Sequence, residues 1–265
     1  MKKITILILF IASTIVSQTN TEVFLFDIKK TETGYELSNK KNISTNEGYD
    51  SQPHFYDNYA LLFASSRNGQ TDIVKYTIDT GIKEFINYSP EGGEYSPQRI
   101  PGTDDISAVR LDNTGLQRFY RYDINTGNSK EIIRNLEVAY PLWASNKLLF
   151  SAVIGEKSLE LVKSDLKNKT NVLLEKNIGR SLHCIPGTNS ISFISKKKPL
   201  WEIFSIDITT LTINKITNLD DNYEDIAWIS KDVVLQAKKN QLLQFNIKTD
   251  SVWKELINKD SLQIQ

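Results

Sequence analysis

The residues of this chain that could carry out acid–base or nucleophilic chemistry are few. Histidine occurs twice, as His54 and His183, and cysteine once, as Cys184. Two distant histidines and one cysteine do not easily supply the nitrogen and sulfur ligands of a multi-histidine zinc or iron site. A single cysteine also cannot form an intrachain disulfide. The sequence therefore predicts no metal and no cofactor.

Motifs of enzymes that use an activated nucleophile or bind phosphate do not occur in the sequence. There is no Gly-x-Ser-x-Gly elbow and no glycine-rich phosphate loop. Cys184 has apolar neighbours in an expected strand, which favours a small buried hydrophobic side chain over a nucleophile. We therefore assign no catalytic residue.

Charge is balanced along the chain, with 32 Lys and Arg against 32 Asp and Glu. Removing residues 1–17 takes away Lys2 and Lys3 and no acid, which leaves the remainder about two charges negative. A nucleic-acid-binding protein normally has a basic excess gathered on one face. The balance predicts no nucleic-acid partner.

The first seventeen residues have the pattern of a cleavable signal peptide. Lys2 and Lys3 precede an uncharged, mostly apolar run over residues 4–15, and Ser17 is a small residue at a suitable cleavage point. A dozen helical residues rise only about 18 Å, too little for a hydrocarbon core of about 30 Å. We expect residues 1–17 to be removed and residues 18–265 to be periplasmic or secreted, with no membrane span after cleavage. The alternative is an uncleaved N-terminal anchor.

The chain repeats itself with a period of about 43 residues. Residues 99–107 (RIPGTDDIS) match residues 184–192 (CIPGTNSIS) at a shift of 85 residues, which is two periods. Further copies begin near residues 51, 140 and 225, and a partial copy lies around residues 24–28. Six copies are therefore expected, the first without its front half.

Each repeat contains four short strand-like runs. In the first full copy these runs are residues 52–56, 60–65, 72–78 and 82–87, separated by turn residues such as Asn68-Gly69 and Thr80-Gly81. Inner runs such as residues 60–64 are apolar on both sides, as expected for strands between neighbouring sheets. No run has the apolar spacing of a helix. Four strands in a repeat of about 43 residues are typical of a β-propeller blade.

The first full repeat resembles the WD-like repeat of TolB propellers. The resemblance lies in Pro53-His54-Phe55, in residues 62–69 (LFASSRNG) and in residues 72–76 (DIVKY). It implies a six-bladed β-propeller of four-stranded antiparallel blades over residues 18–265. The fold itself implies little about role, since one fold can serve as scaffold, binder or enzyme.

The blade that closes the ring is expected to be incomplete. Residues 24–28 and 35–43 supply its third and fourth strands, so its first two strands should follow Lys259. Residues 260–265 can form one short strand but not two. Either this blade has three strands or the chain is shortened.

Acidic residues recur at two positions of the repeat. We interpret the first set, near the end of the third strand, as Asx turns. The second set precedes first strands, where carboxylates could bind Ca²⁺ or form a solvated rim, but Val138 and Ile178 or Gly179 interrupt it. The first set is Asp27, Asp123, Asp165 and Asp207, and the second is Asp50, Glu94 and Glu224.

Polar side chains in or near the first strands are expected to line the mouth of the central channel and to bind a ligand there. The alternative for each histidine is a structural hydrogen bond within its own blade. Trp143 and Trp228 occupy matching first-strand positions, which favours packing between blades over stacking on a sugar. The predicted ligand-binding residues are Gln52, His54, Gln98, Arg99, Tyr140, His183, Glu94 and Glu224.

Three functions fit these observations. The first is an exported, non-catalytic scaffold that binds a protein or peptide partner in the cell envelope, acting as a monomer. The second is an enzyme at the channel mouth, of the lyase or lactonase type. The third is a glycan or peptide sensor. Polar residues converging in the channel would favour the enzyme, and apolar exposure on a rim would favour the scaffold.

The signal-peptide interpretation predicts that the mature protein begins within a few residues of Gln18. N-terminal sequencing of the protein from its native host measures this directly. An intact Met1 on a soluble cytoplasmic species would contradict it.

Overall fold

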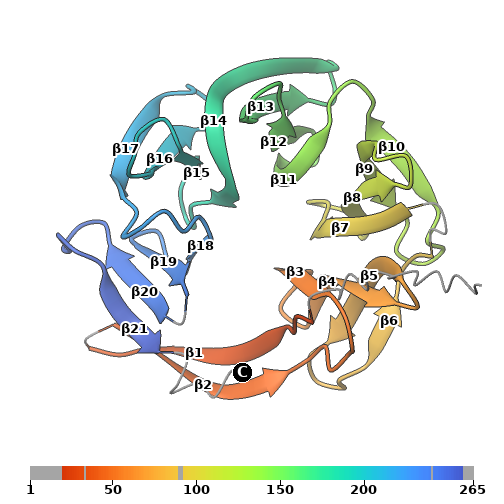
Figure 1. The fold of residues 1–265 in the computed structure, drawn as a ribbon, viewed down its shortest axis with the longest axis horizontal. Helices are drawn as coiled ribbons and strands as arrows, with labels where there is room; N and C mark the ends of the chain where they lie inside the picture. Colours follow the sequence, from red (N-terminus) through yellow and green to blue (C-terminus); the bar gives the residue numbers. More distant parts are fainter. Residues whose placement is uncertain (1–19, 33, 89–91, 240, 259–265) are drawn as a thin grey trace, which may run out of the picture.

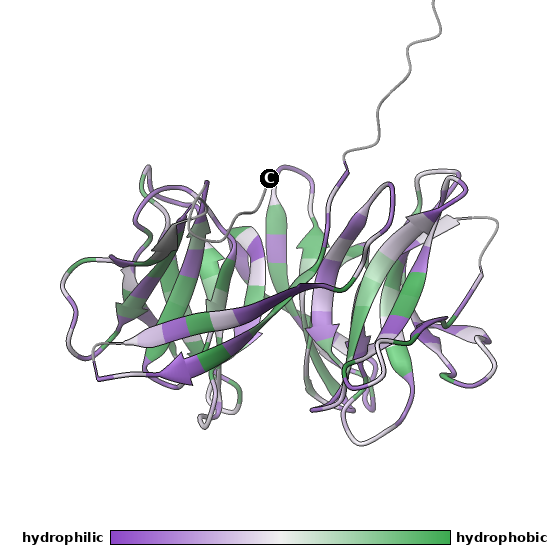
Figure 2. Cartoon of the chain, turned by 90° about the horizontal axis from the view of Figure 1, so that it is seen from below, coloured by the Kyte–Doolittle hydropathy of each residue, from purple (hydrophilic) through white to green (hydrophobic). Residues whose placement is uncertain are grey.

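The computed structural model describes residues 20–32, 34–88, 92–239 and 241–258. These residues form 21 strands, arranged in five sheets. The sheets stand around a central opening (Figure 1), and the strands cross the thickness of the ring (Figure 2). The all-β prediction is confirmed for these ranges, in which no helix long and apolar enough to span a membrane is found. The expected signal peptide and the expected strand after Lys259 lie outside them.

Three sheets have four strands each, paired in chain order. In the first, the strands agree with the predicted runs to within two residues at each end. The sheets are β3 (Asp50–Phe55), β4 (Ala60–Arg67), β5 (Gln70–Thr77) and β6 (Lys83–Phe85); β7 (Gly92–Arg99), β8 (Ile106–Asp112), β9 (Gln117–Tyr122) and β10 (Ser129–Ile133); and β18 (Ile226–Trp228), β19 (Val233–Lys238), β20 (Gln241–Asn246) and β21 (Lys254–Asn258).

A fourth sheet has seven strands because one long strand belongs to two repeats. The first part of β14 pairs with β13, and its last part pairs with β15. Asn177, with a φ of 58°, lies at the change of partner. The repeat pattern predicts two separate strands here, but the chain passes from one to the next without a loop. The strands are β11 (Val138–Ser145), β12 (Leu148–Ile154), β13 (Leu159–Asp165), β14 (Thr170–Cys184), β15 (Ser190–Ser195), β16 (Glu202–Asp207) and β17 (Ile213–Asn218).

The core lies between neighbouring sheets. Leu62 of β4 and Ile73 of β5 are fully buried in one cluster with Ile106 of β8 and Tyr122 of β9. Burying an aliphatic side chain of this size contributes about 1.5–3 kcal/mol. Adjacent sheets are therefore held together face to face, which explains the doubly apolar runs of the sequence.

Two tryptophans join neighbouring repeats in the same way. The indole Nε1 of Trp143 in β11 donates a hydrogen bond of 2.8 Å to Ser107 Oγ in β8. Trp228 in β18 donates an equivalent bond of 2.8 Å to Ser192 Oγ in β15. The prediction that both pack between repeats is confirmed.

Three of the four recurring aspartates form the predicted Asx turns. Asp123, Asp165 and Asp207 each accept hydrogen bonds of 2.7–3.0 Å on Oδ1 from the backbone two and three residues ahead. The prediction was wrong for Asp27, because this residue lies within β1 and its carboxylate accepts a bond from Asn39 Nδ2 across the hairpin.

The fifth sheet has only two strands among the described residues, β1 (Phe24–Lys30) and β2 (Tyr35–Asn42). Figure 1 shows β1 on the side that faces the central opening. Most side chains of both strands are exposed or half-buried. Because the hydrogen-bonded sheets number five, the six-bladed count stays a prediction.

The two-stranded sheet should open more readily than the other sheets, because it buries little apolar surface and has one ladder of hydrogen bonds. We expect amide protons of residues 24–42 to exchange with solvent faster than those of β8, β12 and β15. Hydrogen exchange followed by mass spectrometry measures this. Equal protection in all sheets would contradict the expectation.

Candidate ligand-binding site

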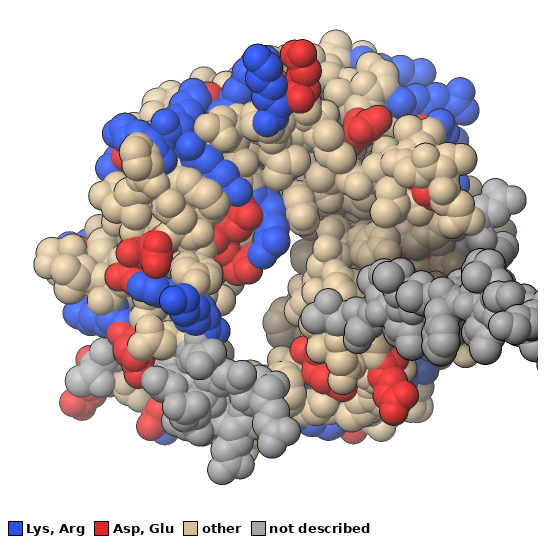
Figure 3. Space-filling view, viewed as in Figure 1, with Lys and Arg blue, Asp and Glu red and all other residues tan. Residues whose placement is uncertain are grey.

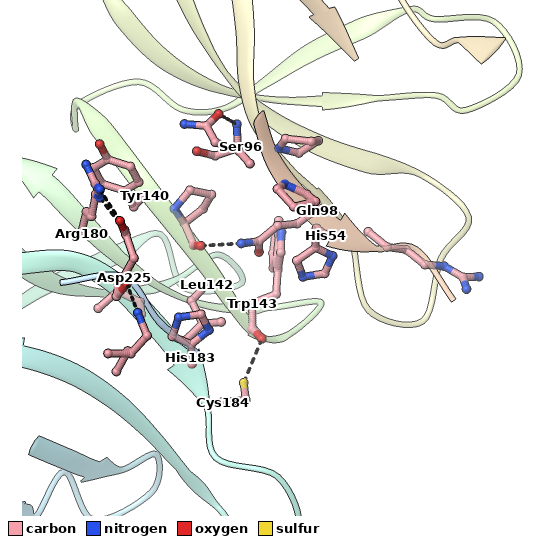
Figure 4. Close-up of a pocket in the computed structure, with 18 of the residues that line it drawn as sticks. His54, Ser96, Gln98, Tyr140, Leu142, Trp143, Arg180, His183, Cys184 and Asp225 are labelled. Atoms are coloured by element: carbon pink, nitrogen blue, oxygen red, sulfur yellow. Dashed lines mark hydrogen bonds and ion pairs between the residues drawn. The ribbon is translucent and has the colours of Figure 1, made fainter. Parts of the chain in front are cut away.

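A cavity of about 500 Å³ lies at the centre of the ring, where the first strands of four repeats converge (Figure 4). Its walls come from β3, β7, β11 and the last part of β14, with the segment that enters β18. Six of the eight predicted ligand-binding residues line it: Gln52, His54, Gln98, Arg99, Tyr140 and His183.

Bulges in the first strands aim these side chains. The pairing register shifts between Ser51 and His54 in β3, and between Tyr95 and Gln98 in β7. Similar shifts occur in β11 and β14. Gln52 and Ser96 lie inside the first two bulges with φ values of 56° and 50°. A bulge bends its strand and re-aims the neighbouring side chains, and here they face the opening.

Side chains tie the neighbouring first strands together around the cavity. Gln52 Oε1 accepts a 2.7 Å hydrogen bond from Ser96 N, and Gln98 Nε2 donates a 2.7 Å bond to the carbonyl oxygen of Pro141. On the opposite wall, Ser181 Oγ accepts a bond of 3.3 Å from Ile226 N. The wall is therefore braced by the same polar residues that face the cavity.

Two imidazoles stand together in the cavity, one from β3 and one from β14 (Figure 4). Burial lowers the pKa of His54, and burial together with the neighbouring charge of His54 lowers the pKa of His183 to about 4. His54 Nδ1 is buried and has no hydrogen-bond partner among the described residues. Both rings are therefore neutral at pH 7.

An ion pair that sequence reasoning missed stands at one edge of the cavity. The guanidinium of Arg180 donates to both carboxylate oxygens of Asp225, from Nε at 2.9 Å and from Nη2 at 2.7 Å. These hydrogen bonds raise the pKa of Arg180 above its usual range. Both residues stand near the start of a first-strand segment, and this shared position is the signal in the sequence that could have identified them.

Arg99 lines the cavity, but its guanidinium is engaged elsewhere. Nε donates to Thr103 O at 2.7 Å, and Nη2 donates to Asp104 Oδ1 at 2.8 Å. The guanidinium also lies over the ring of Tyr56, 4.4 Å from its centre. These contacts hold the turn between β7 and β8.

Glu94 and Glu224, the other two predicted residues, do not line the cavity. Glu94 is fully buried and accepts a 2.9 Å bond from the hydroxyl of Tyr122. Burial, and then the Glu94 charge, raise the pKa of Tyr122. Glu224 lies 2.9 Å from Lys196 Nζ and accepts a bond from Arg180 N.

The expected solvated rim of acids is therefore wrong for two of its three members. Glu94 is fully buried, and Asp50 is 1% exposed. Their positions face the neighbouring sheet rather than the opening. Burial raises the pKa of Asp50. Within the described ranges, no group of three or more His, Cys, Asp or Glu side chains could hold a metal ion.

The expectation that Cys184 is buried was also wrong. Its side chain is exposed on the cavity wall, and Sγ donates a 3.7 Å hydrogen bond to Trp143 O. The end of β14 lies along the opening, so an apolar sequence neighbourhood does not enclose the thiol here. Partial burial nevertheless raises the pKa of the thiol, which disfavours the reactive thiolate.

Comparison with known proteins supports the fold. No protein-family model matches the sequence, and no curated protein matches it. Among solved structures, the chain is similar to a putative TolB from Agrobacterium tumefaciens, with a TM-score of 0.68 and 12% identity, over 90% of each chain. TolB from Acinetobacter baumannii has a TM-score of 0.60 and 14% identity, over 84% of this chain but only 60% of its own length.

Other similar structures belong to enzymes. An oligogalacturonate lyase in complex with manganese has a TM-score of 0.61 and 12% identity, over 92% of this chain and 87% of the lyase. Likeness at such low identity shows the fold alone. The chain therefore has a TolB-like propeller fold.

The neutral histidines predict a pH-dependent stability. His183 has a folded pKa of about 4 against an ordinary value of 6.5, so the unfolded chain binds more protons between these values. The stability due to this residue is complete above pH 6.5 and is lost as the pH falls toward 4, by up to about 1.4 kcal/mol per pH unit.

Urea unfolding of the wild type and of His183→Gln between pH 7 and pH 4.5 measures this loss. We expect the wild type to lose more free energy of unfolding than the variant over this range. Because the comparison shares all carboxylates, including Asp50, their titration cancels. Parallel pH profiles for the two proteins would contradict a neutral, buried His183.

Proposed function

We propose that this TolB-like propeller is an exported, non-catalytic scaffold that binds a segment of a protein partner in the central cavity. The observation that carries the proposal is the double use of the cavity's polar residues. Gln52, Gln98 and Ser181 are held in place by bonds to neighbouring strands while they line the space. A rigid, preformed wall of this kind lowers the entropic cost of binding.

The composition of the wall also favours binding. Pro53, Pro97 and Pro141 follow one another on neighbouring strands, and Leu142 and Leu182 lie beside them. Mostly apolar walls with a few fixed polar groups are typical of ligand sites. The remaining predicted residues around this space, His54, Arg99, Tyr140 and His183, would contribute contacts rather than chemistry.

We further propose that the ring has six blades. The seven-stranded sheet would count as two blades that share β14, and β1 with β2 would be the outer half of the closing blade. Residues 1–17 would direct export, residues 18–265 would form the propeller, and the mature monomer would meet its partner in the cell envelope. The balanced charge of the chain supports a partner other than nucleic acid.

A lyase-type or lactonase-type enzyme is the second candidate, because the histidine pair opens into the cavity. Both imidazoles are neutral at pH 7 since burial lowers their pKa values. A neutral imidazole can take a proton as a general base, but it cannot at once serve as the acid. The known lyase with a similar fold is a binding partner for manganese according to its description, so manganese belongs in the assay.

The single cysteine gives a direct test, because Cys184 is exposed on the cavity wall. We expect a bulky maleimide on Cys184 to abolish capture of the partner from envelope extracts by residues 18–265. The small reagent N-ethylmaleimide should have less effect. Cys184→Ser treated with the bulky reagent is the control and should capture the partner normally.

Capture that is unaffected by the bulky adduct would place the partner away from the cavity. Turnover of lactones or uronate oligosaccharides, with or without manganese, that is lost in His183→Ala would replace the scaffold by the enzyme. The same assay in Glu224→Gln serves as a comparison, because Glu224 does not line the cavity.

A further inference from the structure

We infer that Gln52 and Gln98 act as a donor and acceptor pair that recognises one main-chain amide unit of an extended peptide in the cavity. The inference rests on the proposed function and names the chemistry that the site reads. It assigns binding specificity to two side chains that also brace the wall.

The orientation of the Gln52 carboxamide is fixed by its partner. Ser96 N can only donate, so the atom 2.7 Å away must be the carbonyl oxygen Oε1 of Gln52. The NH₂ group, Nε2, makes no hydrogen bond with any described residue and is not fully buried. Gln52 therefore presents a donor to the cavity.

Gln98 has the opposite orientation. The carbonyl oxygen of Pro141 can only accept, so the atom 2.7 Å away must be Nε2 of Gln98. Its Oε1 has no partner within the described ranges and is also not fully buried. Gln98 therefore presents an acceptor.

One donor and one acceptor match the hydrogen-bonding groups of one residue in an extended peptide, whose N–H and C=O point to the same side. Gln98 belongs to β7, and Gln52 is attached to the same strand through Ser96. The pair therefore imitates the edge of a strand, the mode by which proteins bind peptides through main-chain bonds.

The rest of the cavity favours a peptide over a sugar. A sugar ring presents several hydroxyl groups, and each needs a partner when it is buried. The carboxylate of Asp225 is already paired with Arg180, and the indole Nε1 of Trp143 is bonded to Ser107. Pro53, Pro97, Pro141 and Leu182 offer apolar surface instead.

Exchange of disulfides at Cys184 measures this recognition. A capped Cys-Gly-Ala-Ala-Ala peptide forms a mixed disulfide with the only cysteine of the chain, and its exchange constant against mercaptoethanol reports non-covalent binding. Three analogues each replace one successive amide by an ester, which removes one N–H donor. We expect one analogue to exchange about threefold to tenfold less favourably than the parent peptide.

Two variants of Gln98 provide matched controls. Gln98→Met and Gln98→Glu both lose the donor to Pro141 O, but only the glutamate keeps an acceptor for the peptide. The amide-to-ester difference should vanish in Gln98→Met and persist in Gln98→Glu. Gln52→Glu keeps the bond from Ser96 N but loses the donor, so it should weaken the parent peptide about threefold to tenfold.

The inference is overturned if all ester analogues behave like the parent peptide in the wild type. It is also overturned if a thiol derivative of N-acetylglucosamine exchanges more favourably than the peptide. Either result leaves the proposed function standing when the bulky adduct on Cys184 still blocks capture of the partner. Capture that resists the adduct would instead remove the proposed function.

Discussion

The edge of the first strands imposes the constraint on which the rest of this structure depends. In each four-stranded sheet the first strand faces the central opening, where no further strand completes the ladder. Polar backbone groups near such an edge need partners, and an open edge invites pairing with other chains. Gln52, Gln98 and Ser181 supply bonds to the backbone of the next repeat. The ring is thereby joined at its inner side as well as by its core.

The same constraint explains where the cavity lies. Bulges at Gln52 and Ser96 bend the first strands and bring their side chains toward the opening. In the space-filling view the centre of the ring is hollow, with acidic and basic side chains along part of its border (Figure 3). Acids placed a few residues earlier, Asp50 and Glu94, turn instead into the packed layer between sheets. A small change of position along the strand thus separates structural acids from residues that face the ligand.

Electrostatics in the cavity follow from burial more than from charge. The one ion pair at its edge, that of Arg180 with Asp225, is paired within the cavity residues themselves. The two histidines are neutral because the surroundings disfavour their charged forms. A space with neutral donors, neutral acceptors and proline walls suits uncharged polar groups such as main-chain amides, and a free anion has little to pair with.

The sequence by itself determined the all-β class, the strands of the first full repeat, the Asx turns at Asp123, Asp165 and Asp207 and the packing of Trp143 and Trp228, because alternation, turn chemistry and repeat spacing are local signals. It also brought six cavity residues together, since equivalent strand positions meet at the axis of a ring. Only the tertiary structure decided that Cys184 is exposed, that Asp50 and Glu94 are buried, and that Arg180 pairs with Asp225. These outcomes depend on bulges and on the neighbouring sheet, which is distant in sequence, so no local pattern could contain them.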